Sequence, residues 1–182
     1  MVNSKSAYSV AGKKQRNDTH IIVVWVDNEA GVLARVVGLF SGRGYNIESL
    51  AVAEVDQKQN ISRITIVTTG TPQVIDQIKL QLKKLVPVHK VADFKREDKN
   101  VIFKEMALFK FVANNKKLIS ALNACRNYNP VVLDQTKKSQ VIQITALRRE
   151  IDKMSKNLTK FGLVSVSRTG AVAMTRGSEI FK

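Results

Sequence analysis

The sequence has little of the residue types that metal centres and secreted folds use. Among 182 residues there is one cysteine, Cys125, so no disulfide can form within the chain, which is typical of a reducing compartment. We expect this thiol to be a small buried apolar group on a helix. Only two histidines occur, and the sequence has no C-x-x-C, H-E-x-x-H or calcium-loop pattern. We therefore expect no metal site.

Long hydrophobic runs are also missing. The stretch at residues 21–26 is far shorter than the roughly 20 apolar residues of a membrane helix, so we expect a soluble, cytoplasmic protein. The first 19 residues are basic and lack an apolar centre, which excludes a secretory signal. We predict that residues 1–19 form a disordered arm, although a transit peptide to the plastid stroma stays open as an alternative.

Catalytic motifs are absent as well. There is no Walker loop, no G-x-G-x-x-G and no serine in a nucleophile elbow. Gly42 and Gly44 follow a predicted helix instead of a strand, so they cannot form a dinucleotide-binding turn. The carboxylates are scattered, and no pair suits acid–base chemistry. The sequence thus predicts no catalytic residues, no cofactor in this chain and a role other than that of an enzyme.

Positive charge is abundant and unevenly placed. The net charge is +15, and residues 95–182 hold eighteen Lys and Arg against seven Asp and Glu. A basic surface of this kind suits an acidic partner or nucleic acid. The predicted strands at 62–67 and 141–145 have no aromatic residue on which a base could stack. Nucleic-acid binding through backbone charge alone remains the alternative function.

Periodicity predicts two similar α+β domains. In the first half, apolar residues recur at helical spacing between two β-branched segments, and Thr71 followed by Pro72 begins a second helix. A polar stretch at residues 95–100 predicts a linker, which we place at residues 95–102. The predicted order, strand–helix–strand–strand–helix–strand, occurs twice and is ferredoxin-like. The predicted domains are residues 20–94 and 103–182. The predicted strands are 21–26, 47–54, 62–68, 86–94, 105–112, 130–133, 140–145 and 163–174, the last of them interrupted at Gly170. The predicted helices of the second domain are 114–127 and 146–161.

The segment at residues 27–50 has the features of a small-molecule site. Gly31 stands where a strand passes into a helix, and the free N–H groups of a first helical turn suit a carboxylate. Asn28 and Asn46 flank the helix with amides that can read an ammonium or a carboxylate, and residues near Val32 and Ile47 can line an apolar pocket. The alternative is that Gly31 is only a turn glycine and that the asparagines are helix caps.

The same segment resembles a known family. Residues 28–50 read NEAGVLARVVGLFSGRGYNIESL and are similar to the opening of an ACT domain, in particular that of the regulatory small subunit of acetolactate synthase. The C-terminal SRTGAVAMTRG at residues 167–177 is similar to the end of that subunit, whereas Lys104 stands where the family more often has arginine. The resemblance extends over residues 20–182 and implies that the first domain is an ACT domain, which binds the effector and dimerises.

The resemblance also implies a function and a site. Such subunits bind and activate a catalytic large subunit that carries thiamine diphosphate, magnesium and FAD, and they confer feedback inhibition by valine, in some members by isoleucine or leucine. Two ACT domains form a homodimer with the effector at their interface. By motif position, one subunit would contact the effector through Asn28, Gly31, Val32 and Leu33, and the other through Asn46 and Ile47.

Overall fold

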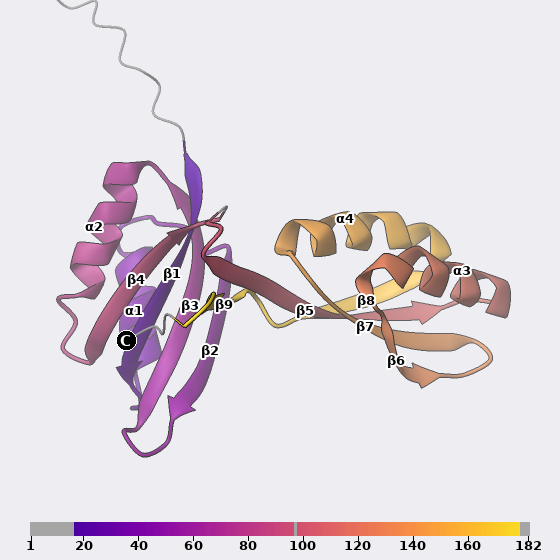
Figure 1. Cartoon of the computed structure of the whole chain (residues 1–182), viewed down its shortest axis with the longest axis horizontal. Helices are drawn as coiled ribbons and strands as arrows, with labels where there is room; N and C mark the ends of the chain where they lie inside the picture. Colours follow the sequence, from indigo (N-terminus) through magenta and orange to yellow (C-terminus); the bar gives the residue numbers. More distant parts are fainter. Residues whose placement is uncertain (1–16, 97, 179–182) are drawn as a thin grey trace, which may run out of the picture.

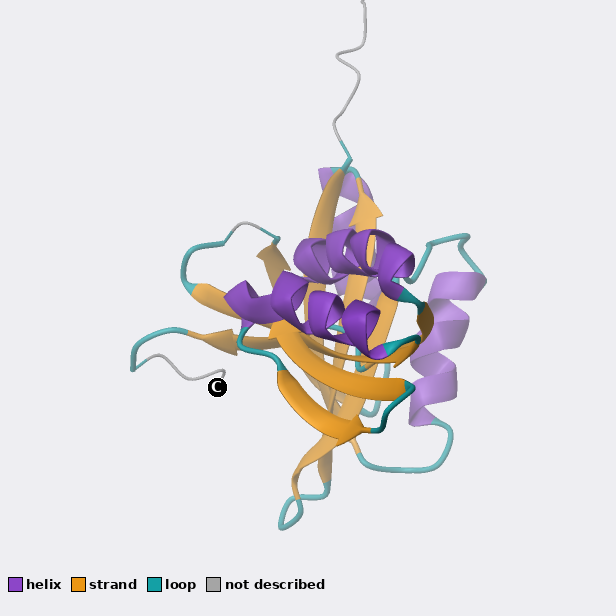
Figure 2. Ribbon diagram, turned by 90° about the vertical axis from the view of Figure 1, so that its right-hand side faces the viewer, coloured by secondary structure: helices purple, strands orange, loops and turns teal. Residues whose placement is uncertain are grey.

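The computed structural model of the chain describes residues 17–96 and 98–178 and consists of two units joined by one long strand (Figure 1). Each unit is an antiparallel sheet with two helices over one of its faces, as Figure 2 shows for the helices of the second unit. The repeated element order confirms the predicted α+β, ferredoxin-like class. Residues 1–16 of the predicted basic arm lie outside the described residues, while Asp18 and Thr19 already belong to the first strand.

The first unit has the sheet order β2-β3-β1-β4. The central strand β1 pairs with β3 along its whole length, from Asp18 opposite Gly70 to Asp27 opposite Ile61. The second helix begins as predicted, because the Thr71 Oγ1 accepts a hydrogen bond from the Val74 N–H at 3.4 Å. The elements are β1 (Asp18–Asp27), α1 (Val32–Ser41), β2 (Ser49–Asp56), β3 (Ile61–Gly70), α2 (Pro72–Leu82) and β4 (Val88–Lys95).

Strand β1 is buried on both faces, which explains why its apolar run does not alternate with polar residues. Ile22 and Val24 point towards α1 and α2 and belong to the core that these helices cover. Ile21 and Val23 point to the opposite face and belong to a separate apolar cluster. The sheet of the first unit is therefore covered on both sides at its centre.

The second unit repeats the pattern with the sheet order β6-β7-β5-β8. Its helices cover a core that contains Phe109 and Phe111. Asn114 caps α3 through a 3.0 Å hydrogen bond from the Lys117 N–H to its Oδ1. The elements are β5 (Val101–Val112), α3 (Asn115–Cys125), η1 (Arg126–Tyr128), β6 (Val131–Gln135), β7 (Ser139–Ala146), α4 (Arg148–Leu158), η2 (Thr159–Phe161) and β8 (Leu163–Arg168).

The end of the described chain agrees only in part with the sequence prediction. Residues 163–174 are interrupted around Gly170 as predicted, but the interruption separates two strands that pair with different parts of β5. After β8 the chain crosses back to the first unit, where β9 (Val172–Thr175) pairs with the first part of β5, from Val101 to Lys104. This two-stranded ribbon, which we call the β5–β9 ribbon, packs Val101 and Ala173 onto the open face of the first sheet (Figure 1). The predicted linker at residues 95–102 is correspondingly shorter, because β5 begins at Val101.

Gly170 makes this crossing possible. Its φ of +80° is a conformation that side chains rarely adopt, and an added Cβ would lie 2.8 Å from the Ser49 Oγ. The Ser49 hydroxyl in turn accepts a 3.3 Å hydrogen bond from the Ala171 N–H. The two units therefore touch at the beginning of β2 as well as along the β5–β9 ribbon.

Candidate functional site

Gly31 opens α1 in a way that leaves donors free. It adopts the left-handed conformation, with φ 84° and ψ −8°, and no atom lies within 4 Å of the position its Cβ would take. The Arg35 N–H bonds to the Gly31 carbonyl at 3.0 Å, and the Val32 N–H makes only a long 3.4 Å contact with the Glu29 carbonyl. Within the described part of the chain nothing accepts a hydrogen bond from the N–H groups of Leu33 and Ala34. These donors, at the positive end of the helix, are available to an anion.

Of the predicted contact residues next to Gly31, Asn28 and Leu33 can offer side chains to a ligand, whereas Val32 can offer only its backbone. Asn28 lies three residues before the N-cap position, so the expectation that it caps α1 is wrong. Its Oδ1 instead accepts a 2.9 Å hydrogen bond from the Ser62 hydroxyl, which orients the amide. The Val32 side chain is buried in the core, so that only its backbone can reach a ligand, whereas the Leu33 side chain is 41% exposed.

Asn46 and Ile47 lie between α1 and β2. The Asn46 side chain is exposed. The main-chain carbonyl of Asn46 accepts a 2.7 Å hydrogen bond from the Thr68 Oγ1, which holds the segment against the end of β3. Ile47 is partly buried and packs against the core of the first unit. The Asn46 amide therefore faces outward on a backbone that is held in place.

Within one copy of the chain, the predicted contacts around Asn28 and those around Asn46 lie far apart. Asn28 contacts the beginning of β3 through Ser62, while Asn46 contacts its end through Thr68. At about 3.3 Å per strand residue, these positions are roughly 20 Å apart, which is too far for one amino acid to bridge. A site that uses both groups needs a second copy of the chain.

The segment after Ile47 touches the second unit, a feature that the sequence analysis missed. The Glu48 carbonyl accepts a 3.2 Å hydrogen bond from Arg148 at the start of α4, and the two side chains form a 3.7 Å ion pair. Ser49 bonds to the Ala171 N–H, as described above. No sequence motif marks these contacts, because they join positions about a hundred residues apart.

Arg168 forms the most buried ion pair of the second unit. Its guanidinium donates to both oxygens of the buried Glu105 carboxylate, at 2.6 and 2.8 Å, and to Asp152 at 2.6 Å. The hydrogen bond with Glu105 is the main cause that raises the pKa of Arg168, with Asp152 adding to it. This arrangement joins β5, β8 and α4. The described residues hold no group of three or more His, Cys, Asp or Glu side chains that suits a metal ion.

Comparison with known families gives two matches that together extend over most of the chain. Residues 22–90 match the family described as AHAS small subunit-like ACT domain, and residues 104–177 match the family described as small subunit of acetolactate synthase. The first match contains both groups of predicted effector contacts. The second contains α4 and the return of the chain to the first unit.

Individual relatives agree with these matches. An acetolactate synthase small subunit of Aquifex aeolicus is 38% identical over 162 residues, 88% of this chain and 83% of that protein. One of Mycobacterium bovis is 35% identical over 159 residues, 87% of this chain and 93% of that protein. The crystal structure of the acetolactate synthase small subunit from Thermotoga maritima superposes with a TM-score of 0.78 at 31% identity, covering 88% of this chain and 99% of that one. The fold, the two matched families and these relatives together establish that this chain belongs to the small, non-catalytic subunits of acetolactate synthase.

Proposed function

We propose that the chain is a regulatory subunit that binds and activates a thiamine-diphosphate-dependent catalytic subunit in the cytoplasm and makes it sensitive to valine, or to isoleucine or leucine. The opening of α1 is the observation that carries the proposal. Gly31 presents unpaired N–H groups at the positive end of the helix with open space in front of them, an arrangement that suits the carboxylate of an amino acid. Leu33 offers an apolar surface beside these donors.

A homodimer would complete the site. Strand β2 is an edge of the first sheet and runs from the Asn46 end to the end where Gly31 lies. If β2 pairs antiparallel with its twin about a two-fold axis, Asn46 of one copy approaches Gly31 of the other. The exposed Val52 and Val55 side chains on this edge favour such a contact. Each dimer would then hold two equivalent effector sites.

The effector signal has a short route to the second unit. Asn46 and Ile47 are followed directly by Glu48 and Ser49, which contact Arg148 and Ala171. A ligand that fixes Asn46 would therefore also bias the contact between the units, and it can act only through its different affinities for the two arrangements.

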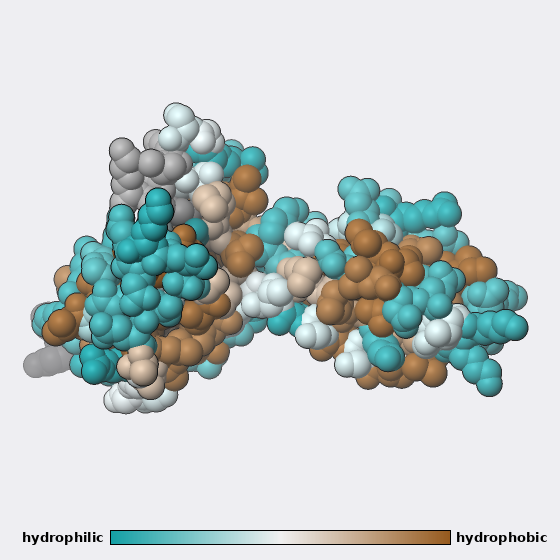
Figure 3. Space-filling model, turned by 90° about the horizontal axis from the view of Figure 1, so that it is seen from below, coloured by the Kyte–Doolittle hydropathy of each residue, from teal (hydrophilic) through white to brown (hydrophobic). Residues whose placement is uncertain are grey.

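The second sheet offers a surface for the catalytic subunit. The face that its helices leave open carries a broad apolar area, seen from below in Figure 3. Val131 and Leu133 of the edge strand β6 are about half exposed, at 50% and 52%. Apolar surface of this extent is typical of a permanent subunit contact. The basic side chains of α3 and α4 lie on the opposite side and remain available for an acidic part of the partner.

Calorimetry with valine tests the effector site. We expect Gly31→Asp to abolish the heat of binding, because it adds a carboxylate where the carboxylate of the ligand would lie. Gly31→Asn is the matched control, because asparagine tolerates the left-handed conformation and has nearly the same shape without the charge. It should keep measurable binding. Equal valine affinity in Gly31→Asp and wild type would refute the site.

Co-expression with an acetolactate synthase catalytic subunit tests the assignment as a whole. The two chains should purify together, the catalytic rate should rise when this chain is present, and valine should lower it. A chain that binds oligonucleotides with a steep salt dependence and does not change the catalytic rate would instead be the nucleic-acid binder considered above.

A further inference from the structure

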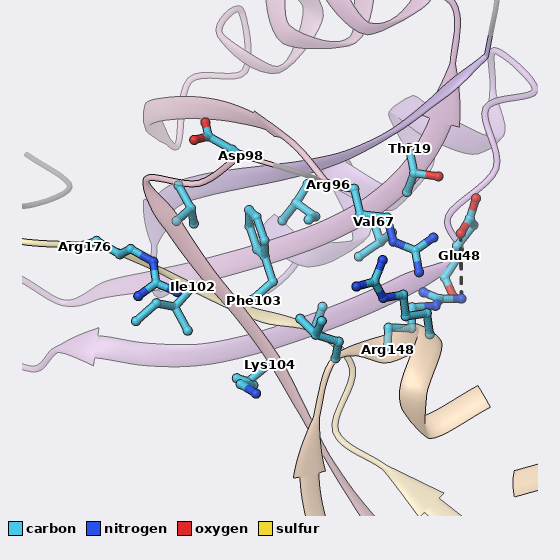
Figure 4. A pocket seen from close by; sticks show the side chains of 15 residues that line it. Thr19, Glu48, Val67, Arg96, Asp98, Ile102, Phe103, Lys104, Arg148 and Arg176 are labelled. Carbon is cyan, nitrogen blue, oxygen red and sulfur yellow. Dashed lines mark hydrogen bonds and ion pairs between the residues drawn. The ribbon is translucent and has the colours of Figure 1, made fainter. Parts of the chain in front are cut away.

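A cavity lies between the two units, away from Gly31. It has a volume of about 480 Å³ and is lined by the first sheet, the segment after β4, the β5–β9 ribbon and the start of α4 (Figure 4). A cavity of this size holds a small organic molecule. Neither the family match nor the proposed effector site accounts for it.

The walls of the cavity carry an excess of positive charge. Among the described residues, five cationic side chains and two carboxylates line it, an excess of three positive charges. Glu48 and Arg148 lie at one end and are paired with each other, while Arg176 lies towards the other end (Figure 4). The lining cations are Arg96, Lys104, Arg148, Arg149 and Arg176, and the carboxylates are Glu48 and Asp98.

One of these arginines has a buried donor without an acceptor among the described residues, and two others are exposed and unpaired. Arg148 uses one nitrogen for Glu48, and its other terminal nitrogen, Nη1, is buried without a hydrogen bond. The side chains of Arg96 and Arg149 make no ion pair with any described residue. A buried donor without an acceptor is unfavourable, so an anion in this cavity would relieve it. The planar guanidinium group suits the two oxygens of a carboxylate or a phosphate.

The remaining wall is apolar. Ile21 and Val67 of the first sheet line the cavity together with Phe103 of β5 and Leu147 before α4. The Glu48 carboxylate is already paired with Arg148, and the Asp98 Oδ1 accepts a 2.9 Å hydrogen bond from the Asn100 N–H, so the cavity offers an ammonium group little beside the second oxygen of Asp98. With five cationic side chains in the lining, the walls favour an anion over a zwitterion such as an amino acid.

From these observations we propose that the cavity is a second ligand site, which takes a small organic anion with a carboxylate or phosphate head and an apolar body. The head contacts Arg96, Arg148 and Arg149, and the body lies against Phe103 and the residues around it. Arg96 belongs to the first unit and the other two arginines to the second, so the ligand bridges the units. It therefore acts on the same Glu48–Arg148 contact that the effector route uses.

Calorimetry on the full chain with three probes tests this site. The probes are phenyl phosphate, phenylacetate and inorganic phosphate. The site variant is Arg96→Gln with Arg149→Gln, and the matched control is Arg126→Gln with Lys117→Gln, which removes two exposed positive charges outside the cavity. Valine binding at the Gly31 site is measured in every variant, so that a failure of one site does not imply failure of the other.

We expect phenyl phosphate, phenylacetate or both to bind. The probe that binds more tightly identifies the preferred head group as phosphate or carboxylate. The site variant should weaken this binding about tenfold or more, since it removes two charge-assisted contacts, and the control about twofold or less. Inorganic phosphate should bind more weakly than phenyl phosphate, because it has no apolar body. The proposal is overturned if neither organic anion binds, if inorganic phosphate binds as well as phenyl phosphate, or if the control weakens binding as much as the site variant.

Discussion

Two glycines with positive φ, Gly31 and Gly170, have opposite surroundings and therefore different roles. Around Gly31 there is open space, and its conformation exposes backbone donors to solvent. Gly170 is enclosed, because the Ser49 Oγ and the Leu50 carbonyl lie 2.8 and 3.1 Å from where its Cβ would be. A side chain at position 31 therefore changes what the site can bind, whereas one at position 170 would push the two units apart.

Cys125 provides a prediction at the residue scale. The thiol is fully buried on α3, as expected from the sequence, and burial raises its pKa from 9.0 to about 11. We expect the native protein to resist iodoacetamide at pH 8, as followed by mass spectrometry, and to react readily in urea.

The same shift predicts a dependence of stability on pH. The unfolded thiol ionises before the folded one, so stability that is complete below pH 9 should decline between pH 9 and pH 11. The Cys125→Ala variant should lack this part of the decline in urea titrations. Rapid alkylation of the native protein at pH 8 would show that the thiol is accessible after all.

At the scale of elements, the edge strand β2 has both an unpaired backbone edge and exposed apolar side chains. Its backbone has a partner on one side only, in β3, and its Val52 and Val55 side chains are 44% and 51% exposed. Exposed apolar edges are normally protected against chance pairing by charges or by another chain. Because Glu54 is the only charged residue between Ser49 and Val55, a second copy of the chain is the simplest protection.

The Val52→Lys variant tests this role of β2. A lysine on each of two antiparallel edges would bring positive charges together, so we expect the dimer to dissociate at least tenfold more readily in analytical ultracentrifugation. Val86→Lys is the control, because Val86 is 96% exposed and lies before β4, at the other side of the sheet. An unchanged dimer in Val52→Lys would place the contact between copies elsewhere.

At the scale of the whole molecule, the two units are tied together at two points. The β5–β9 ribbon covers the first sheet with apolar residues, and the Glu48–Arg148 and Ser49–Ala171 contacts join the effector segment to the second unit. The ribbon buries apolar side chains and is the stronger tie. The polar contacts are partly exposed and individually weak, which suits a connection that changes with ligand.

The Glu48→Gln variant tests the weaker tie. The side chain is 28% exposed, so its ion pair contributes about 1 kcal/mol or less to stability, and we expect the fold and valine binding to persist. Inhibition of the holoenzyme by valine should nevertheless require about fivefold more valine or become incomplete, because the signal between the units is weakened. The control is Asp76→Asn on the surface of α2, which removes a carboxylate away from the contact. Unaltered inhibition in Glu48→Gln would exclude this route.

The sequence alone determined the local elements and the family. Helical and strand periodicity, the Thr71–Pro72 helix start and the glycine at the entry of α1 depend on neighbouring residues, so they can be read along the chain. The segment at residues 28–50 is sufficient to suggest the family that the comparisons establish. Small shifts remained at the ends of elements, as at β2, which begins at Ser49 instead of residue 47.

Only the tertiary structure decided what joins the two halves. The departure of β9 from the second sheet, the fit of Gly170 against Ser49 and the meeting of Arg96 with Arg148 and Arg149 depend on residues far apart in the chain. Such contacts leave no periodic pattern, because each requires only one residue of suitable size or charge at a place that the packing of other elements creates. The same reason explains why the sequence left a helix cap open as an alternative for Asn28, whose side chain instead accepts a hydrogen bond from Ser62 at the start of β3.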